Sequence, residues 1–112
     1  MYSSGWIRGM MAKTMETDRF IKHVVTTINR QLKLWDDHYK VSLLQDLLGQ
    51  DFYEIVVNLE DKVFQVTLQC RDVEYLQARG PYALDQHIWR KLVDDGLVIE
   101  EGKGNYVDYC AI

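Results

Sequence analysis

The sequence is poor in the residues that build disulfide scaffolds, long linkers and membrane spans. It has two cysteines, Cys70 and Cys110, and one proline in 112 residues. Two cysteines are too few for a disulfide framework, so we expect both to be buried thiols. No stretch approaches the ~18 apolar residues of a transmembrane helix, and the N-terminus lacks the apolar core of a secretory signal. We therefore expect a cytoplasmic protein that does not contact membranes.

Recognisable catalytic and metal-binding motifs are also missing. The histidines, His23, His38 and His87, fall in three separate predicted elements, without His-x-x-x-His or Cys-x-x-Cys spacing. Asp36 and Asp37 precede His38, but neighbouring residues point apart on a helix, so we interpret this group as a solvated helix end. No serine lies in a Gly-x-Ser-x-Gly elbow. We predict no catalytic residue, no metal and no cofactor, and thus a protein that is not an enzyme.

Charge is distributed unevenly around a formal net value of −4. Residues 1–40 contain seven basic against four acidic residues, whereas residues 41–112 contain six against thirteen. An acidic body repels phosphate backbones and helps to keep the protein in solution. Nucleic acid is therefore not the partner that we expect.

The length suits one domain, and 47% apolar and 27% charged residues are ordinary for a globular protein. Residues 1–14 show no hydrophobic period and are predicted to be a flexible N-terminal tail. Residues 15–112 are predicted to be a single α+β domain. Its strongest element is an amphipathic helix over 18–35, in which apolar residues recur at steps of three and four.

Further helices are indicated by shorter patterns. Ser42 and Gln45 have the spacing of a capping box before a leucine-rich segment, which favours a short helix over 43–48. An edge strand from residue 40 to 48 is the competing interpretation. A helical pair is predicted over 72–79 and 83–95, with Gly96 ending the second helix.

Two antiparallel β-hairpins, about 52–70 and 97–110, complete the α+β fold. In the first, pairs of positions that sum to 121 join inward residues, as in Val57 with Phe64 and Ile55 with Val66. A two-residue and a four-residue loop give the same register, and we favour four because Glu-Asp suits a primed turn poorly. In the second, glycines at 102 and 104 suit a three-residue loop. Helices on one face of an antiparallel sheet are therefore expected.

These features favour a small protein-interaction or regulatory module that works by surface contact. The partner would be another protein or a second copy of the chain, as in a homodimer. The evidence is a basic helix face, a weakly charged outward hairpin face and aromatic residues of the kind enriched at interfaces. The candidate interaction residues are Arg19, Lys22, Arg30, Lys33, Trp35, Val56, Val63 and Trp89.

The alternative function is nucleic-acid binding through residues 72–110. The segment IWRKLVDDGLVIEEGKGNYV resembles the recognition helix and wing of winged-helix regulators of the GntR type. This resemblance implies a helix-turn-helix followed by a wing, with Arg90, Lys91 and Lys103 as candidate contacts. Here several acidic residues accompany these three cations, which departs from the charge of a DNA-binding surface.

Overall fold

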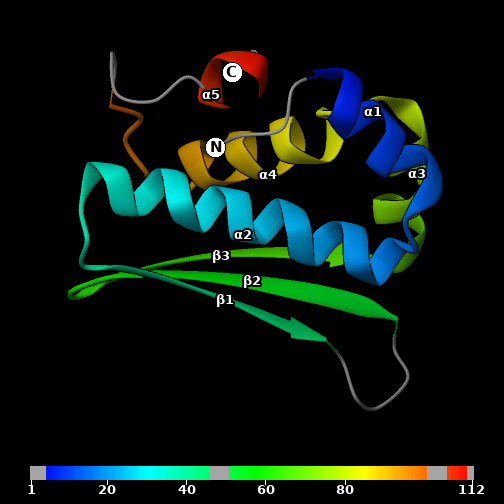
Figure 1. Cartoon of the computed structure of the whole chain (residues 1–112). Helices are drawn as coiled ribbons and strands as arrows, with labels where there is room; N and C mark the ends of the chain where they lie inside the picture. The colour runs from blue at the N-terminus through cyan, green and yellow to red at the C-terminus, as the bar shows by residue number, and fades with distance from the viewer. Residues whose placement is uncertain (1–4, 46–50, 101–105, 111–112) are drawn as a thin grey trace.

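A computed structural model describes residues 5–45, 51–100 and 106–110 of the chain (Figure 1). The predicted α+β class is confirmed for this part of the chain. Helices and strands follow in the order α1 (Gly5–Thr14), α2 (Thr17–Trp35), β1 (Tyr39–Gln45), β2 (Phe52–Leu59), β3 (Lys62–Gln69), α3 (Cys70–Arg79), α4 (Ala83–Asp94) and α5 (Tyr106–Cys110).

The strands form an antiparallel sheet in the order β1-β2-β3. The predicted register of the first hairpin is confirmed: Val57 pairs with Phe64 and Ile55 with Val66. Its loop has two residues, because Leu59 pairs with Lys62, so the preference for four residues was wrong. Glu60 takes a positive φ of 54°. A positive φ in the loop is what a two-residue hairpin turn requires, and Glu60 adopts it although Glu is not a preferred residue there.

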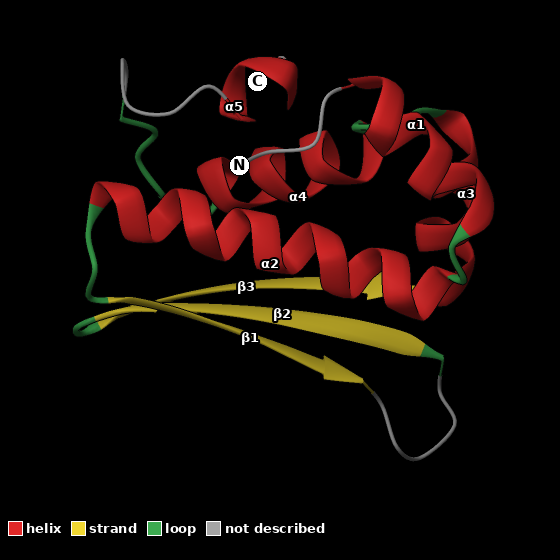
Figure 2. Ribbon diagram, in the orientation of Figure 1, coloured by secondary structure: helices red, strands yellow, loops and turns green. Residues whose placement is uncertain are grey.

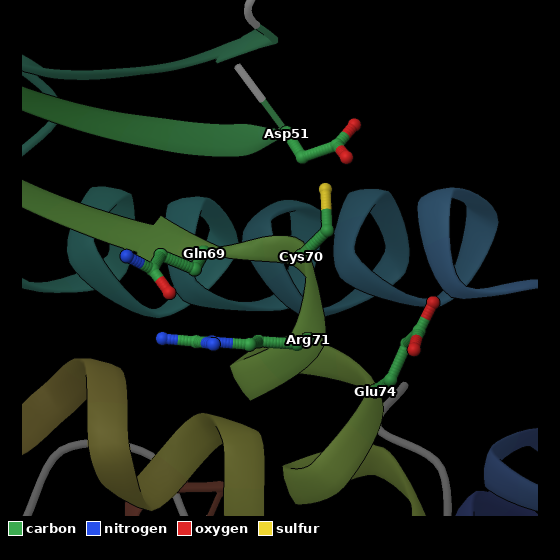
Figure 3. Close-up of a pocket in the computed structure, with 5 residues that line it drawn as sticks. All are labelled: Asp51, Gln69, Cys70, Arg71 and Glu74. Atoms are coloured by element: carbon green, nitrogen blue, oxygen red, sulfur yellow. The ribbon is translucent and has the colours of Figure 1, made fainter. Parts of the chain in front are cut away.

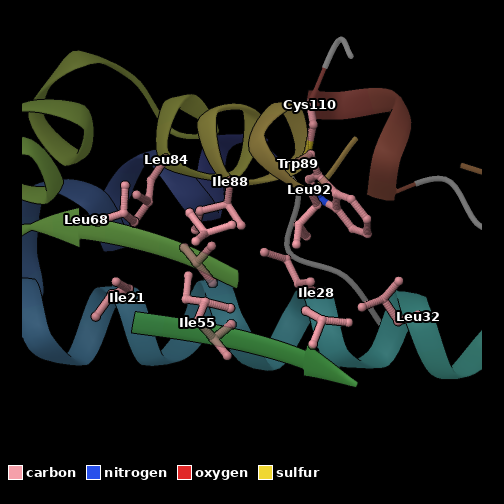
Figure 4. Close-up of a cluster of buried hydrophobic side chains, with 14 of the residues drawn as sticks. Ile21, Ile28, Leu32, Ile55, Leu68, Leu84, Ile88, Trp89, Leu92 and Cys110 are labelled. Atoms are coloured by element: carbon pink, nitrogen blue, oxygen red, sulfur yellow. The ribbon is translucent and has the colours of Figure 1, made fainter. Parts of the chain in front are cut away.

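The described helices lie on one side of the sheet (Figure 2). The predicted helix over 18–35 is confirmed as α2, which packs against the sheet beside α4. Figure 4 shows Ile28 and Leu32 of α2 in one buried cluster with Ile55 of β2 and Ile88 of α4. These four side chains are fully buried, and burying one such side chain contributes about 1.5–3 kcal/mol. None of the described helices is long and apolar enough to cross a membrane.

The predicted short helix over 43–48 is wrong where the structure describes it. Leu43, Leu44 and Gln45 belong to β1, which pairs with β2 along its whole length. Residues 46–48 lie outside the described residues. Leucines at 43 and 44 fit either period, and hydrogen bonds to β2 favour the strand. The competing prediction of an edge strand is therefore correct for residues 40–45.

The predicted second hairpin over 97–110 is also wrong. Residues 97–100 have no regular structure, and Tyr106–Cys110 is the helix α5. The predicted loop at 102–104 lies outside the described residues. The helical spacing turns both Tyr106 and Cys110 inward, each about 1% exposed. Burying both ends of this segment against α4 outweighs the alternation that favoured a strand.

Residues 5–14, predicted as part of a tail, form α1. Gln77 of α3 donates hydrogen bonds to the carbonyl oxygens of Ala12 and Met15, at 2.9 and 2.8 Å. Arg8 is 1% exposed. A buried arginine breaks the apolar period that sequence analysis looks for, which explains why this helix was missed.

Candidate functional site

A hydrogen-bonded group of polar side chains is buried between α1, α4 and α5. Arg8 donates to Asp85 at 2.5 Å and to the Pro81 carbonyl oxygen at 3.2 Å. The Tyr106 hydroxyl donates to the other Asp85 oxygen, and the Trp89 indole N–H donates to that hydroxyl at 3.3 Å. We call Arg8, Asp85, Trp89 and Tyr106 the buried polar cluster.

The electrostatics of this cluster keep it inert. Burial, reinforced by Asp85, holds the pKa of Tyr106 well above its usual value. The same two causes raise the pKa of the neighbouring Cys110 to about 12. The four members of the cluster are at most 1% exposed, so a substrate has no access to them. The cluster joins both ends of the described chain to α4, and we assign it a structural role.

An exposed group of potential metal ligands lies at the end of α2. Asp36 accepts from the backbone N–H of His38 at 2.9 Å and contacts the His38 ring nitrogen at 2.8 Å. These hydrogen bonds lower the pKa of Asp36 and raise that of His38. Asp37 joins them, with all three ligand atoms within 4.8 Å. The expectation that these side chains diverge was wrong, because Asp36 leaves the helix with extended backbone.

A pocket of about 430 Å³ lies where β3 meets α3, lined by Asp51, Gln69, Cys70, Arg71 and Glu74. Figure 3 shows the Cys70 sulfur directed toward Asp51, with the Arg71 side chain extending away from it. Burial and the Asp51 charge raise the pKa of Cys70. A thiol whose pKa is raised is a poor nucleophile. The Cys70 thiol faces a carboxylate, whereas a reactive cysteine has electropositive surroundings.

The predicted contact residues divide into surface and core. Arg19, Lys22, Arg30 and Lys33 are exposed on α2. Two predictions fail because the side chains are core residues: Trp89 is 0% and Trp35 is 8% exposed, and their rings lie 5.7 Å apart between centroids. Neither tryptophan offers a partner a contact surface.

The structure also lacks the second wing strand that the predicted nucleic-acid site requires within the described residues. Arg90 and Lys91 are exposed on α4, but α5 occupies the place of the second strand of the wing. Lys103 lies outside the described residues. An exposed patch that the sequence did not reveal lies on α1, where Trp6 and Met10 share one side and are 74% and 50% exposed.

The remaining surface is the side of the sheet that faces away from the described helices, which we call the open face. The register of β1, β2 and β3 places alternate side chains on it. Among these described side chains, Lys40 and Glu54 are the charged ones. The open face consists of Lys40, Ser42, Leu44, Phe52, Glu54, Val56, Asn58, Val63, Gln65, Thr67 and Gln69.

The two edges of the sheet differ. On the outer edge of β3, the backbone N–H of Gln65 donates to the Asp95 carboxylate at the end of α4, at 3.3 Å. Among the described strands, β1 pairs with β2 and has no neighbour on its other side. An unpaired edge offers a row of backbone donors and acceptors to another chain. Val56 and Val63 lie on the open face, as predicted from the alternation of the hairpin.

Comparisons of the chain with protein-family models, with curated proteins and with solved structures find no match.

Proposed function

We propose that this chain is a small protein-interaction module that works by surface contact and not by chemistry, with the open face and the adjoining β1 edge as its contact surface. The observation that carries the proposal is the one-sided fold. The described helices pack on one side of a three-stranded sheet (Figure 2). The other side is weakly charged.

The composition of the open face supports protein contact. Leu44 and Val63 are 53% and 54% exposed and lie on the two outer strands, with Val56 between them on β2. Protein interfaces are depleted of charge at their centres and keep charged groups at the rim. Lys40 alone cannot neutralise a phosphate backbone, and Glu54 repels one.

The surroundings of two candidate reactive groups also support this proposal. Within the described residues, the buried polar cluster is closed to solvent, and the Cys70 thiol faces an acidic side chain. The basic face of α2 is a further surface feature, which could steer an acidic partner toward the sheet.

A site-resolved crosslinking experiment tests the proposal. A photo-reactive amino acid replaces Leu44 or Val63 in the full chain, expressed in the cells that produce it. Tyr75, 63% exposed on α3, is the matched control position. We expect a discrete crosslinked protein, either a second copy or a different chain, from the two open-face positions and none from Tyr75. Equal products from all three positions, or no product at all, would contradict the proposal.

A further inference from the structure

The free edge of β1 has a defined hydrogen-bonding pattern. Tyr39 does not exchange backbone hydrogen bonds with its β2 partner Leu59: its N–H donates to Asp36, at 3.2 Å, and its C=O accepts from Lys33, at 2.9 Å. Hydrogen-bonded and non-hydrogen-bonded pairs alternate in antiparallel ladders. The N–H and C=O groups of Val41 and Leu43 therefore also point to the free edge, while those of Ser42 bond to β2.

The other side of β2 leads to the same assignment. The two-residue loop is closed by the pair Leu59 and Lys62, and Cys70 donates its N–H to the Asp51 carbonyl oxygen at 2.8 Å. Odd-numbered residues of β2 thus bond to β3, which leaves even-numbered ones, including Val56, to bond to β1. Among the described strands, none pairs with the backbone groups of Val41 and Leu43, so this edge can pair with another strand.

From this edge we infer that the occupant is a second copy of the chain, whose β1 pairs antiparallel with β1 of the first copy to form a six-stranded sheet. This inference rests on the proposed function and names the partner. A two-fold axis at Ser42 places Val41 opposite Leu43 of the second copy, and the reverse. This is the register that pairs all residues of Tyr39–Gln45, and it forms four backbone hydrogen bonds between the inward-facing Val41 and Leu43 residues.

The charges of the open face are self-complementary in this register. Lys40 lies opposite Leu44 of the second copy, and Leu44 pairs with Glu54 in its own sheet. Lys40 of one copy and Glu54 of the other therefore occupy one row, separated by a leucine. The two side chains bridge two strand spacings, about 9.6 Å, which a lysine and a glutamate can span together. The symmetry repeats the contact, so both charged residues of the face find opposite charges across the interface.

The helices above the sheet are also brought together by the two-fold axis. Lys22, Asn29 and Lys33 follow at intervals of seven and four, so they share one line along α2. The Lys33 end of this line lies above the β1 edge, because Lys33 donates to the Tyr39 carbonyl oxygen. The two helices run antiparallel, so the first turns of one, which carry Asp18 as well as Lys22, lie toward the other helix's Asp36 and Asp37. The Asn29 side-chain oxygen, buried without a hydrogen-bond partner among the described residues, lies on the same line.

The first test is a charge exchange followed by light scattering over a range of concentrations. Wild type should reach twice the 13.2 kDa of the chain. Lys40→Glu and Glu54→Lys should each weaken the dimer about tenfold, because two pairs change from opposite to like charge. The double variant should restore the affinity to within about threefold of wild type. Lys40 and Glu54 are not in one row within a single copy, so rescue reports a contact between copies.

The second test concerns the backbone. Val41→Pro removes an N–H that points to the free edge and should give a folded monomer, whereas Val41→Ala retains that N–H and should remain dimeric. If the proline variant does not fold, amide exchange of wild type decides: the Val41 and Leu43 amides should exchange more slowly at high concentration.

Three results would overturn the inference: a wild type that is monomeric at every concentration, a dimer indifferent to the charge exchanges, or edge amides indifferent to concentration. A wild type that is monomeric at every concentration, but crosslinks from Leu44 or Val63 to a different protein, would leave the proposed function standing while this dimer fails. A monomer without any crosslink would defeat both.

Discussion

Replacing Asp85 by asparagine should expose how strongly the fold depends on the buried polar cluster. The change retains the shape of the side chain but leaves the Arg8 guanidinium, 1% exposed, without a counter-charge. Breaking a buried ion pair in this way costs about 3–5 kcal/mol. A domain has about 5–15 kcal/mol in total, so Asp85→Asn should remove a large part of the stability.

Urea denaturation followed by circular dichroism measures this loss. With an m-value of about 2 kcal/mol per M, the midpoint should fall by about 1.5–2.5 M. Asp108→Asn, at an exposed position of α5, is the matched control and should change stability by less than about 0.5 kcal/mol. Arg8→Met combined with Asp85→Leu should recover much of the loss, because no buried charge remains. A midpoint for Asp85→Asn equal to that of the control would refute the reasoning.

Three further predictions address the backbone, a titration and a thiol. Gly96 has a φ of +107°, so Gly96→Ala should cost about 1–2 kcal/mol in thermal unfolding, while Gly80→Ala, with open space around the added carbon, should cost less. By NMR, His38 should titrate above its usual 6.5 because of its hydrogen bond to Asp36, and Asp36→Asn should lower that pKa. The stability from this pair should be present below pH 6.5 and lost as pH rises through the folded pKa. Cys110, with a pKa of about 12 and 1% exposure, should react with a thiol reagent only after unfolding.

The open face illustrates how far the sequence can lead. Alternating apolar residues in the segment 52–69 led to the correct register and placed Val56 and Val63 outward. Period-two alternation is a strong signal because a one-residue slip would expose the whole apolar set. The sequence could not reveal that β1 adds a third strand, since residues 43 and 44 fit a helix equally well.

For the two tryptophans that we predicted as contact residues, the sequence was misleading. Trp35 and Trp89 belong to residue types that are enriched at interfaces, yet both pack inside the core. Residue type alone does not distinguish an exposed aromatic side chain from a buried one. The packing of α2 against α4 makes that distinction, and it depends on contacts between residues 54 positions apart.

The sequence by itself determined the α+β class, the helix α2 and the pairing of β2 with β3, because each follows from a local period. Tertiary structure decided the remainder: the strand β1, the helix α5 and the burial of Arg8 against Asp85. Each of these depends on a partner distant in the chain, such as β2 for β1 and α4 for Arg8. A local sequence pattern carries no information about the free energy of such contacts. The unpaired edge of β1 among the described strands is therefore visible only in the tertiary structure.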